Sequence, residues 1–205
     1  MSAKGECGKH GHGRKKKLYK RLFYSLLAFI ILIILTVFII WLVLRPSKPT
    51  FTLQEATIYQ LNATSPNTIS TTLQVTLSSR NPNSRIGIYY DLLQVYASYH
   101  DQQITLPSTI PATYQGHNDL TLWSPVLYGT TIPVAPFVAA ALSQEEAAGY
   151  IVVTVKVDGK LRWKVGSWVS GHYHVYVTCP AYVAYDSSGG TGLRLQQTVG
   201  CSTDV

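Results

Sequence analysis

Apolar and polar residues are distributed unevenly along this chain of 205 residues. Residues 22–44 form an apolar run without a charged side chain. As a helix rising about 1.5 Å per residue, this run would be roughly 34 Å long, which matches a hydrocarbon core about 30 Å thick. A buried core helix would be shorter or would have a polar face, and a secretory signal would be shorter and end at small residues. The pattern therefore predicts an uncleaved transmembrane anchor.

A different pattern follows a short linker at residues 45–50. From 51 to 183, short runs rich in β-branched and aromatic residues alternate between apolar and polar positions, and Pro, Gly, Asn or Ser bounds each run. Such runs are typical of half-buried strands. The sequence therefore predicts a mainly β protein, an antiparallel β-sandwich of about seven to eight strands and one helix behind the anchor.

Local signals add detail to this expected sandwich. Asp158-Gly159 lies between two alternating runs and is expected to form the turn of a β-hairpin. One helix is expected to begin near Pro136 and to end at Gly149. Alternatively, Ser143 and Glu146 could form a capping box that begins a shorter helix. Residues 184–205 are polar and glycine-rich, so they are expected to form a flexible C-terminal segment with one short strand.

The formal charge of +7 is concentrated in the first 21 residues, which form a basic tail. From residue 45 onward, basic and acidic residues are equal in number. A nucleic-acid-binding domain would carry its basic patch on the fold itself, so this class of partner is not expected. The positive-inside rule places the tail in the cytosol and residues 45–205 across the membrane.

The basic residues next to the anchor admit two interpretations. They can act as a topology determinant, which we favour, or as a contact for anionic lipids worth about 1 kcal/mol per residue. The residues concerned are Arg14, Lys15, Lys16, Lys17, Lys20 and Arg21. Cys7 in the same tail is a candidate for reversible acylation.

Two features beyond the anchor depend on an oxidising compartment. Cys179 and Cys201 are the two cysteines there, and they could pair in a disulfide or remain as separate thiols. Asn62 begins the one Asn-x-Thr sequon and is expected to carry a glycan.

The stretch RNPNSRIGIYYD at residues 80–91 breaks one strand and begins another. Pro82 fixes its own φ and favours an extended Asn81, while Asn83 can bond its own backbone in a turn. In the next strand, Tyr90 shares a face with the isoleucines, and Tyr89 and Asp91 share the other.

This stretch, followed by YQGH with Gly116 and His117 and by VDGKLRWKVGSW, closely resembles the plant harpin-induced-like, non-race-specific disease-resistance-like family. Its members are membrane proteins built on a type-2 late-embryogenesis-abundant domain. The resemblance implies a β-sandwich with one helix held outside the plasma membrane or at plasmodesmata, and a role in defence and stress responses. It carries no catalytic residues, and it implies mainly structural roles for these signature positions: Asn81, Pro82, Asn83, Tyr89, Tyr90, Asp91, Gly116 and His117. Members often carry Lys at the position of Asn118, which puts contacts through that lysine in doubt.

An enzymatic function is not expected from these residues. The carboxylates are scattered, the chain lacks a Gly-x-Ser-x-Gly motif, and no cofactor site is evident. His172 and His174 could begin a metal site, but no third ligand lies near them in the sequence.

Two functions remain open. The first is an anchored interaction module that binds membrane or cell-wall proteins. The second is a lipid-binding domain whose PFVAAAL segment lines an apolar cavity. We favour the first function, in which this segment simply packs on the sheet.

Overall fold

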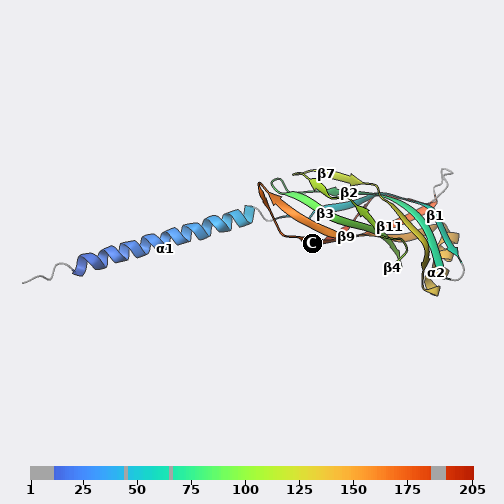
Figure 1. The fold of residues 1–205 in the computed structure, drawn as a ribbon, viewed down its shortest axis with the longest axis horizontal. Coiled ribbons are helices and arrows are strands. Elements are labelled where there is room, and N and C mark those ends of the chain that lie inside the picture. Colours follow the sequence, from blue (N-terminus) through green and yellow to red (C-terminus); the bar gives the residue numbers. More distant parts are fainter. Residues whose placement is uncertain (1–11, 44–45, 65–66, 186–192) are drawn as a thin grey trace, which may run out of the picture. The chain divides into compact units, whose positions relative to one another are not determined.

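The computed structural model describes residues 12–43, 46–64, 67–185 and 193–205, and it contains two compact units, Met1–Arg45 and Pro46–Val205. The first unit is helix α1, His12–Val43 (Figure 1). Its stretch Tyr19–Ile39 has a mean hydropathy of 3.0, and none of it is buried in the protein. The helix begins inside the expected basic tail because Lys and Arg are good helix formers. The chain thus contains a helix long and apolar enough to cross a membrane.

The second unit, which we call the β-domain, is mainly β and antiparallel as predicted. Its strands exceed the expected seven to eight, because short segments at the sheet margins also pair. In the described residues the sheet has fourteen strands. The longer ones are β1 Thr50–Thr64, β2 Thr68–Arg80, β3 Gly87–Tyr99, β8 Val126–Pro133, β9 Tyr150–Val165 and β11 Tyr173–Tyr185. The shorter ones are β4 Gln102–Gln103, β5 Ser108–Ile110, β6 Thr113–Gln115, β7 Leu120–Trp123, β10 Trp168–Val169, β12 Leu193–Leu195, β13 Val199–Gly200 and β14 Ser202–Asp204.

The strands form one curled sheet in the order β4-β3-β9-β11-β12-β1-β2-β7 (Figure 1). Strands β3, β9 and β11 form one half, and β1, β2, β7 and β8 form the other. Strand β12 hydrogen-bonds to both β11 and β1 and so joins the halves. The two halves also meet away from β12. There, Leu106 N, in the chain after β4, donates to Tyr128 O of β8 at 2.8 Å.

The expectation of a flexible segment with one short strand at residues 184–205 is wrong for residues 193–204, and residues 186–192 lie outside the described residues. Over 193–204 the chain forms β12, β13 and β14, which pair with β1 and β11. Cys201, between β13 and β14, is joined by a disulfide to Cys179 of β11. The polar composition of this segment is compatible with strands, because these strands are short and their outer sides face solvent.

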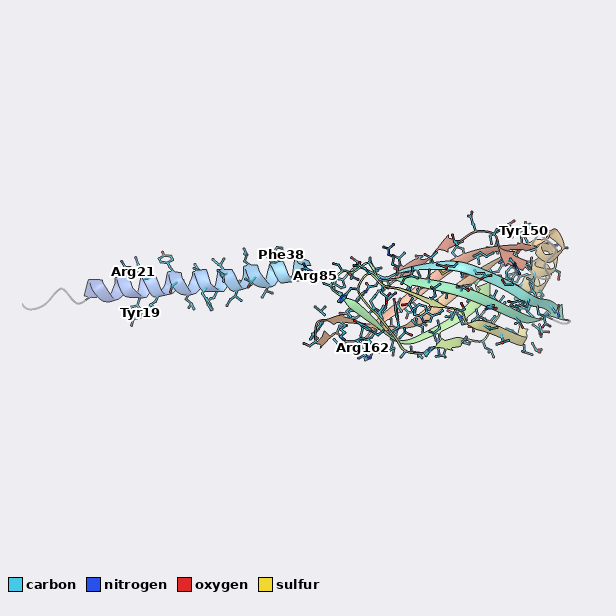
Figure 2. The ribbon with its side chains drawn as sticks, turned by 90° about the horizontal axis from the view of Figure 1, so that it is seen from above. Tyr19, Arg21, Phe38, Arg85, Tyr150 and Arg162 are labelled. Atoms are coloured by element: carbon cyan, nitrogen blue, oxygen red, sulfur yellow. A yellow bond between two sulfur atoms is a disulfide. The ribbon has the colours of Figure 1, made fainter. Side chains whose placement is uncertain are left out.

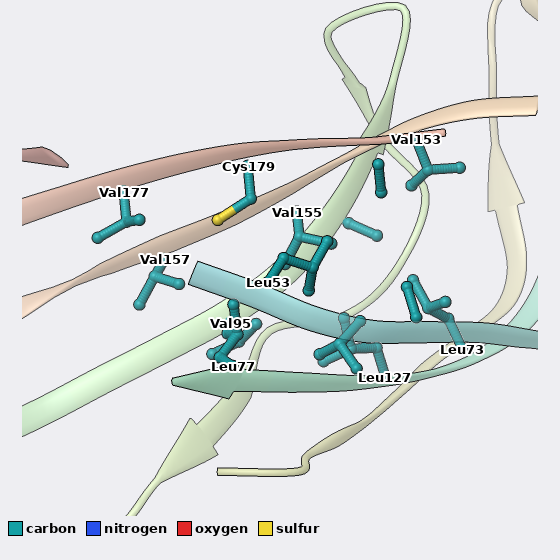
Figure 3. Packing of buried hydrophobic residues seen from close by; sticks show 14 of the residues in the cluster. Leu53, Leu73, Leu77, Val95, Leu127, Val153, Val155, Val157, Val177 and Cys179 are labelled. Atoms are coloured by element: carbon teal, nitrogen blue, oxygen red, sulfur yellow. The ribbon is translucent and has the colours of Figure 1, made fainter. Parts of the chain in front are cut away.

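The core lies between the two halves of the curled sheet (Figure 3). Alternate side chains of each strand point inward, as the alternation of apolar residues predicted. Each of the labelled side chains is at most 2% exposed: Leu53, Leu73, Leu77, Val95, Leu127, Val153, Val155, Val157, Val177 and Cys179.

The predicted hairpin turn at Asp158-Gly159 is wrong. Strand β9 runs without a break through these residues, between β3 and β11. Strand β3 shifts register against β9 between Tyr90 and Leu92, which is a β-bulge. A Cβ on Gly159 would lie 2.2 Å from the carbonyl O of Leu92. Glycine is therefore required here for the close approach of the bulged strand and not for a turn.

Helix α2, Pro136–Ala148, has the predicted bounds. Gly149 follows it with φ 84°, the left-handed conformation that commonly ends a helix. The alternative of a shorter helix from Ser143 is wrong, since Ser143 Oγ donates to Ala139 O at 3.0 Å inside the helix. Val138 and Leu142 are buried, and the helix packs against β9 and β1.

We expect Gly159→Ala to destabilise the β-domain by about 1–3 kcal/mol, because the added methyl group would force β3 and β9 apart. Gly171→Ala is the matched control, since a Cβ there would meet nothing within 4 Å. Urea denaturation of the full chain in detergent, monitored by tryptophan fluorescence, measures the stability of both variants. Equal stability of the two variants would contradict this explanation of Gly159.

Candidate functional site

The loop between β2 and β3 is organised by a buried asparagine. Asn81 is 0% exposed. Its Nδ2 donates to Ile86 O at 2.7 Å and to Gly116 O at 2.8 Å, and its Oδ1 accepts from Asn83 N at 3.0 Å. Its backbone N donates to Asp119 O at 3.0 Å. Each polar atom of this amide therefore has a partner, which is the condition for burying it.

Asn83 connects the same loop to the point at which the chain enters the β-domain. Its Nδ2 donates to Ser47 O and its Oδ1 accepts from Ser47 N, both at 2.8 Å. The side-chain amide thus pairs with a peptide group much as a neighbouring strand would. Pro82, between the two asparagines, is exposed. The segment expected as a linker is therefore fixed at Ser47.

A second buried network surrounds Tyr90. Its hydroxyl lies 2.8 Å from Ser79 Oγ and donates to Gln115 Oε1 at 3.1 Å, and Gln115 Nε2 donates to Ser79 O at 2.7 Å. The ring of Tyr90 meets those of Phe51 and Trp123 edge-on, with centroids 6.2 and 5.4 Å apart. Burial raises the pKa of the Tyr90 phenol well above its ordinary value, because the phenolate would lose its hydration.

The turn between β6 and β7 completes this region. Gly116 provides a carbonyl to the buried amide, and its N donates to Asp119 Oδ2 at 3.3 Å. Asn118 has φ 52°, a left-handed conformation that Asn adopts more readily than most residues. The side chain of His117 is exposed. Of the two signature residues in this turn, Gly116 therefore takes part in the buried network.

The outward side of the signature strand carries charged residues. Arg162 Nε donates to Asp91 Oδ2 at 2.9 Å, and its Nη2 donates to Asp91 Oδ1. His172 Nε2 lies 3.4 Å from Asp91 Oδ2. The hydrogen bond to Asp91 raises the pKa of Arg162 above its ordinary value. Asp91 therefore ties β3 to β9 and to the start of β11.

Two tyrosines and a lysine lie beside this ion pair. The rings of Tyr89 and Tyr114 have centroids 4.6 Å apart. Lys164 Nζ donates to Tyr89 Oη at 3.2 Å and lies 5.4 and 5.0 Å from the two ring centroids, within cation–π distance. The hydrogen bond to Tyr89 raises the pKa of Lys164. A Cβ on Gly87 would lie 2.5 Å from Tyr114 Oη, so glycine lets this ring cover the strand.

The remaining candidate residues lie elsewhere. Asn62 is exposed on β1, opposite Ser70 of β2. Lys20 and Arg21 are exposed on α1. Cys7 lies outside the described residues, as do the side chains of Arg14, Lys15, Lys16 and Lys17, whose backbone belongs to α1.

His172, just before β11, and His174, in β11, do not converge on a shared ligand. His172 faces Asp91, whereas the ring of His174 stacks on Tyr176 with centroids 6.1 Å apart. Among the described residues, no group of three His, Cys, Asp or Glu side chains could hold a metal ion. The signature asparagines bond to the chain's own backbone, which favours the structural interpretation of these positions.

Sequence reasoning missed several partners of the signature residues. Ser47 and Gln115 bond to them from distant parts of the chain. Ser79 bonds to Tyr90 and directly precedes the stretch 80–91, as Gln115 directly precedes Gly116, and these positions were the available signals. Figure 2 shows Arg85, next to the network, and Tyr150 at opposite ends of the β-domain, so the network occupies one end.

Comparison with known proteins places the chain among plant proteins. A family model described as late embryogenesis abundant protein matches residues 76–179. The chain is 45% identical over 208 residues to NDR1/HIN1-like protein 1 of Arabidopsis thaliana, with 98% of this chain and 99% of that protein covered. It is 47% identical to NDR1/HIN1-like protein 12 of the same plant, with 87% and 85% covered. It is 42% identical to NDR1/HIN1-like protein 26, with 97% and 95% covered.

Asn81→Ala should destabilise the β-domain by about 2–4 kcal/mol, because it leaves buried backbone groups of two loops without partners. Gln60→Ala, at an exposed amide on β1, is the control and should change stability by less than about 0.5 kcal/mol. Thermal and urea denaturation of the full chain measure the difference. A loss no larger than that of the control would show that the network does not stabilise the fold.

Alkaline pH should weaken the fold through Tyr90. Because its pKa is raised in the folded chain, the unfolded chain loses this proton first once the pH exceeds about 10. The contribution of Tyr90 is therefore complete below that pH and falls by about 1.4 kcal/mol per pH unit above it. In urea denaturation at successive pH values, Tyr90→Phe should lose stability less steeply than the parent chain. Tyr128→Phe, at an exposed ring, is the control, and parallel curves for Tyr90→Phe and parent would contradict the assignment.

Proposed function

Because this chain belongs to the NDR1/HIN1-like family of late embryogenesis abundant proteins, we propose that it is a single-pass plasma-membrane protein in plant defence and stress responses. The β-domain acts outside the cytosol as an interaction module for membrane or cell-wall components. The anchor is α1, and the N-terminal tail lies in the cytosol. Plasmodesmata are a second location that fits this topology.

The exposed apolar surface of α1 is the observation that carries this proposal. The stretch Tyr19–Ile39 covers 21 residues, and each of its side chains is exposed. A surface of this kind is stable only where hydrocarbon or another protein covers it. The basic residues that precede it, among them Lys20 and Arg21, support a cytosolic N-terminus.

The β-domain supports an interaction role more than a catalytic one. The buried amide of Asn81 is occupied by the chain's own backbone, which makes this region rigid and leaves the outer faces for contacts. We therefore propose no catalytic activity and no cofactor. Lipid binding through helix α2 is not favoured, since Val138 and Leu142 are 0% and 1% exposed and belong to the core.

Protease protection of the full chain in sealed plant microsomes tests the topology. We expect the β-domain to resist added protease until detergent opens the vesicles, and an N-terminal epitope to be cleaved in intact vesicles. Digestion of the β-domain in intact vesicles would refute the proposal.

Asn62 provides an internal reporter in the same microsomes. We expect glycosidase to increase the mobility of the chain, Asn62→Gln to abolish this change, and Thr64→Ser to preserve it because the sequon remains. A glycan on the chain after Asn62→Gln would show that this site is not the modified one.

A further inference from the structure

The solvent side of β3, β9 and β11 carries a strip of cations and aromatic rings, which we call the cationic strip. Lys156, Lys160, Arg162 and Lys164 occupy alternate positions of β9, interrupted by Asp158. They alternate with buried residues and therefore share the outer face. At about 3.3 Å per residue, these positions extend over roughly 26 Å.

This strip makes the charge distribution of the β-domain uneven, although the eight basic and nine acidic residues in 46–205 nearly cancel. Half of the Lys and Arg residues in 46–205 lie on this single strand. By contrast, residues 50–79, which form most of β1 and β2, contain Glu55 as their one charged residue. A cluster of this density within nine residues is typical of surfaces that bind polyanions.

The acidic residues near the strip neutralise it in part. Asp158 lies on the same face between Lys156 and Lys160, and Asp204 of β14 is opposite Tyr176. Asp91 engages Arg162 through two nitrogens. Asp101 Oδ1 lies 3.4 Å from Lys156 Nζ, but Asp101 is 97% exposed, so this pair contributes little and can be exchanged for another anion. Lys160 is exposed. Lys164 Nζ donates one of its three protons to Tyr89 Oη and can donate the others to a ligand.

Aromatic side chains border the cations on both sides. On β3, Tyr89 is opposite Arg162 and Tyr96 is opposite Lys156. On β11, Tyr176 is opposite Asp158 and is 52% exposed. On β6, Tyr114 lies beside Tyr89 and is 44% exposed. Tyrosine offers a flat apolar face together with a hydroxyl group, a combination used at recognition surfaces.

We propose that the cationic strip binds an extended acidic polysaccharide. Its carboxylates pair with Lys156, Lys160 and Lys164, and its sugar rings lie against Tyr114 and Tyr176. Lysine pairs with a carboxylate through charge-assisted hydrogen bonds as a compact point charge. The one Arg of the strip is already held by Asp91, so the lysines carry the charge contacts.

Individual contacts on this strip are weak, and affinity arises from their repetition. Exposed ion pairs contribute about 0.2–1 kcal/mol each, so a short fragment should bind poorly and a long chain well. The biological relevance of the strip rests on the proposed function, because it requires the β-domain to face the polysaccharides outside the cell.

Binding of polygalacturonate to the full chain in neutral phosphatidylcholine nanodiscs tests the proposal. We expect binding to the acid polymer that weakens with added salt, and little binding to its methyl ester. The double variant Lys156→Gln/Lys160→Gln should bind about three- to tenfold more weakly. Arg80→Gln/Arg194→Gln removes the same charge on β2 and β12, away from the strip, and should stay within about twofold of the parent.

Three results would overturn the proposal. They are equal binding of the acid and its methyl ester, equal losses in the two double variants, and equally tight binding of single-stranded DNA, which would indicate an unspecific polyanion surface. Tyr176→Ala adds a readout of ring contact, and it should weaken binding without changing the salt dependence. The assay does not depend on orientation in the membrane, so its failure and a failure of the topology experiment are distinguishable.

Discussion

The β-domain depends on one set of hydrogen bonds, those that join its last strands to both halves of the sheet. Strand β12 pairs with β1 and with β11, while β13 pairs with β1 and β14 with β11. Cys201 N also donates to Phe51 O at 3.0 Å. Without these strands, β1 and β11 would each present an unpaired edge, which costs stability and invites pairing with other chains. The disulfide to Cys179 holds this seam in place and limits the freedom of the unfolded chain.

The signature residues of β3 have different roles on its buried face and on its solvent face. On the inside, Tyr90 and the asparagine amides satisfy buried backbone and side-chain groups and close one end of the domain. On the outside, a bulge at Asp91 brings its carboxylate to Arg162, and Tyr89 supports Lys164. The packed inner side of the strand therefore fixes the positions of the outer cations, because a close-packed core leaves the strand backbone little freedom to move.

Charge is divided between two places with separate proposed roles. In the proposed topology, the basic residues before the apolar helix set its orientation, and their effect requires no fold. The cations of β9 act only as a folded array, since side chains at alternate positions share a face in a strand alone. Together, the proposed anchor and the proposed polysaccharide surface would hold extracellular polymer near the membrane.

By itself, the sequence determined the apolar helix, the alternation that separates core from surface, and the end of α2 at Gly149. These features depend on neighbouring residues, so local periodicity and capping suffice to define them. The tertiary structure alone decided that β9 continues through Gly159, that residues 193–204 close the sheet, and that Ser47 and Gln115 complete the buried network. Each of these depends on a partner distant in the chain. In the sequence, a glycine that allows a neighbouring strand to approach closely cannot be distinguished from a glycine in a turn. The structure distinguishes them at Gly159, because the carbonyl O of Leu92 lies 2.2 Å from the position of a Cβ.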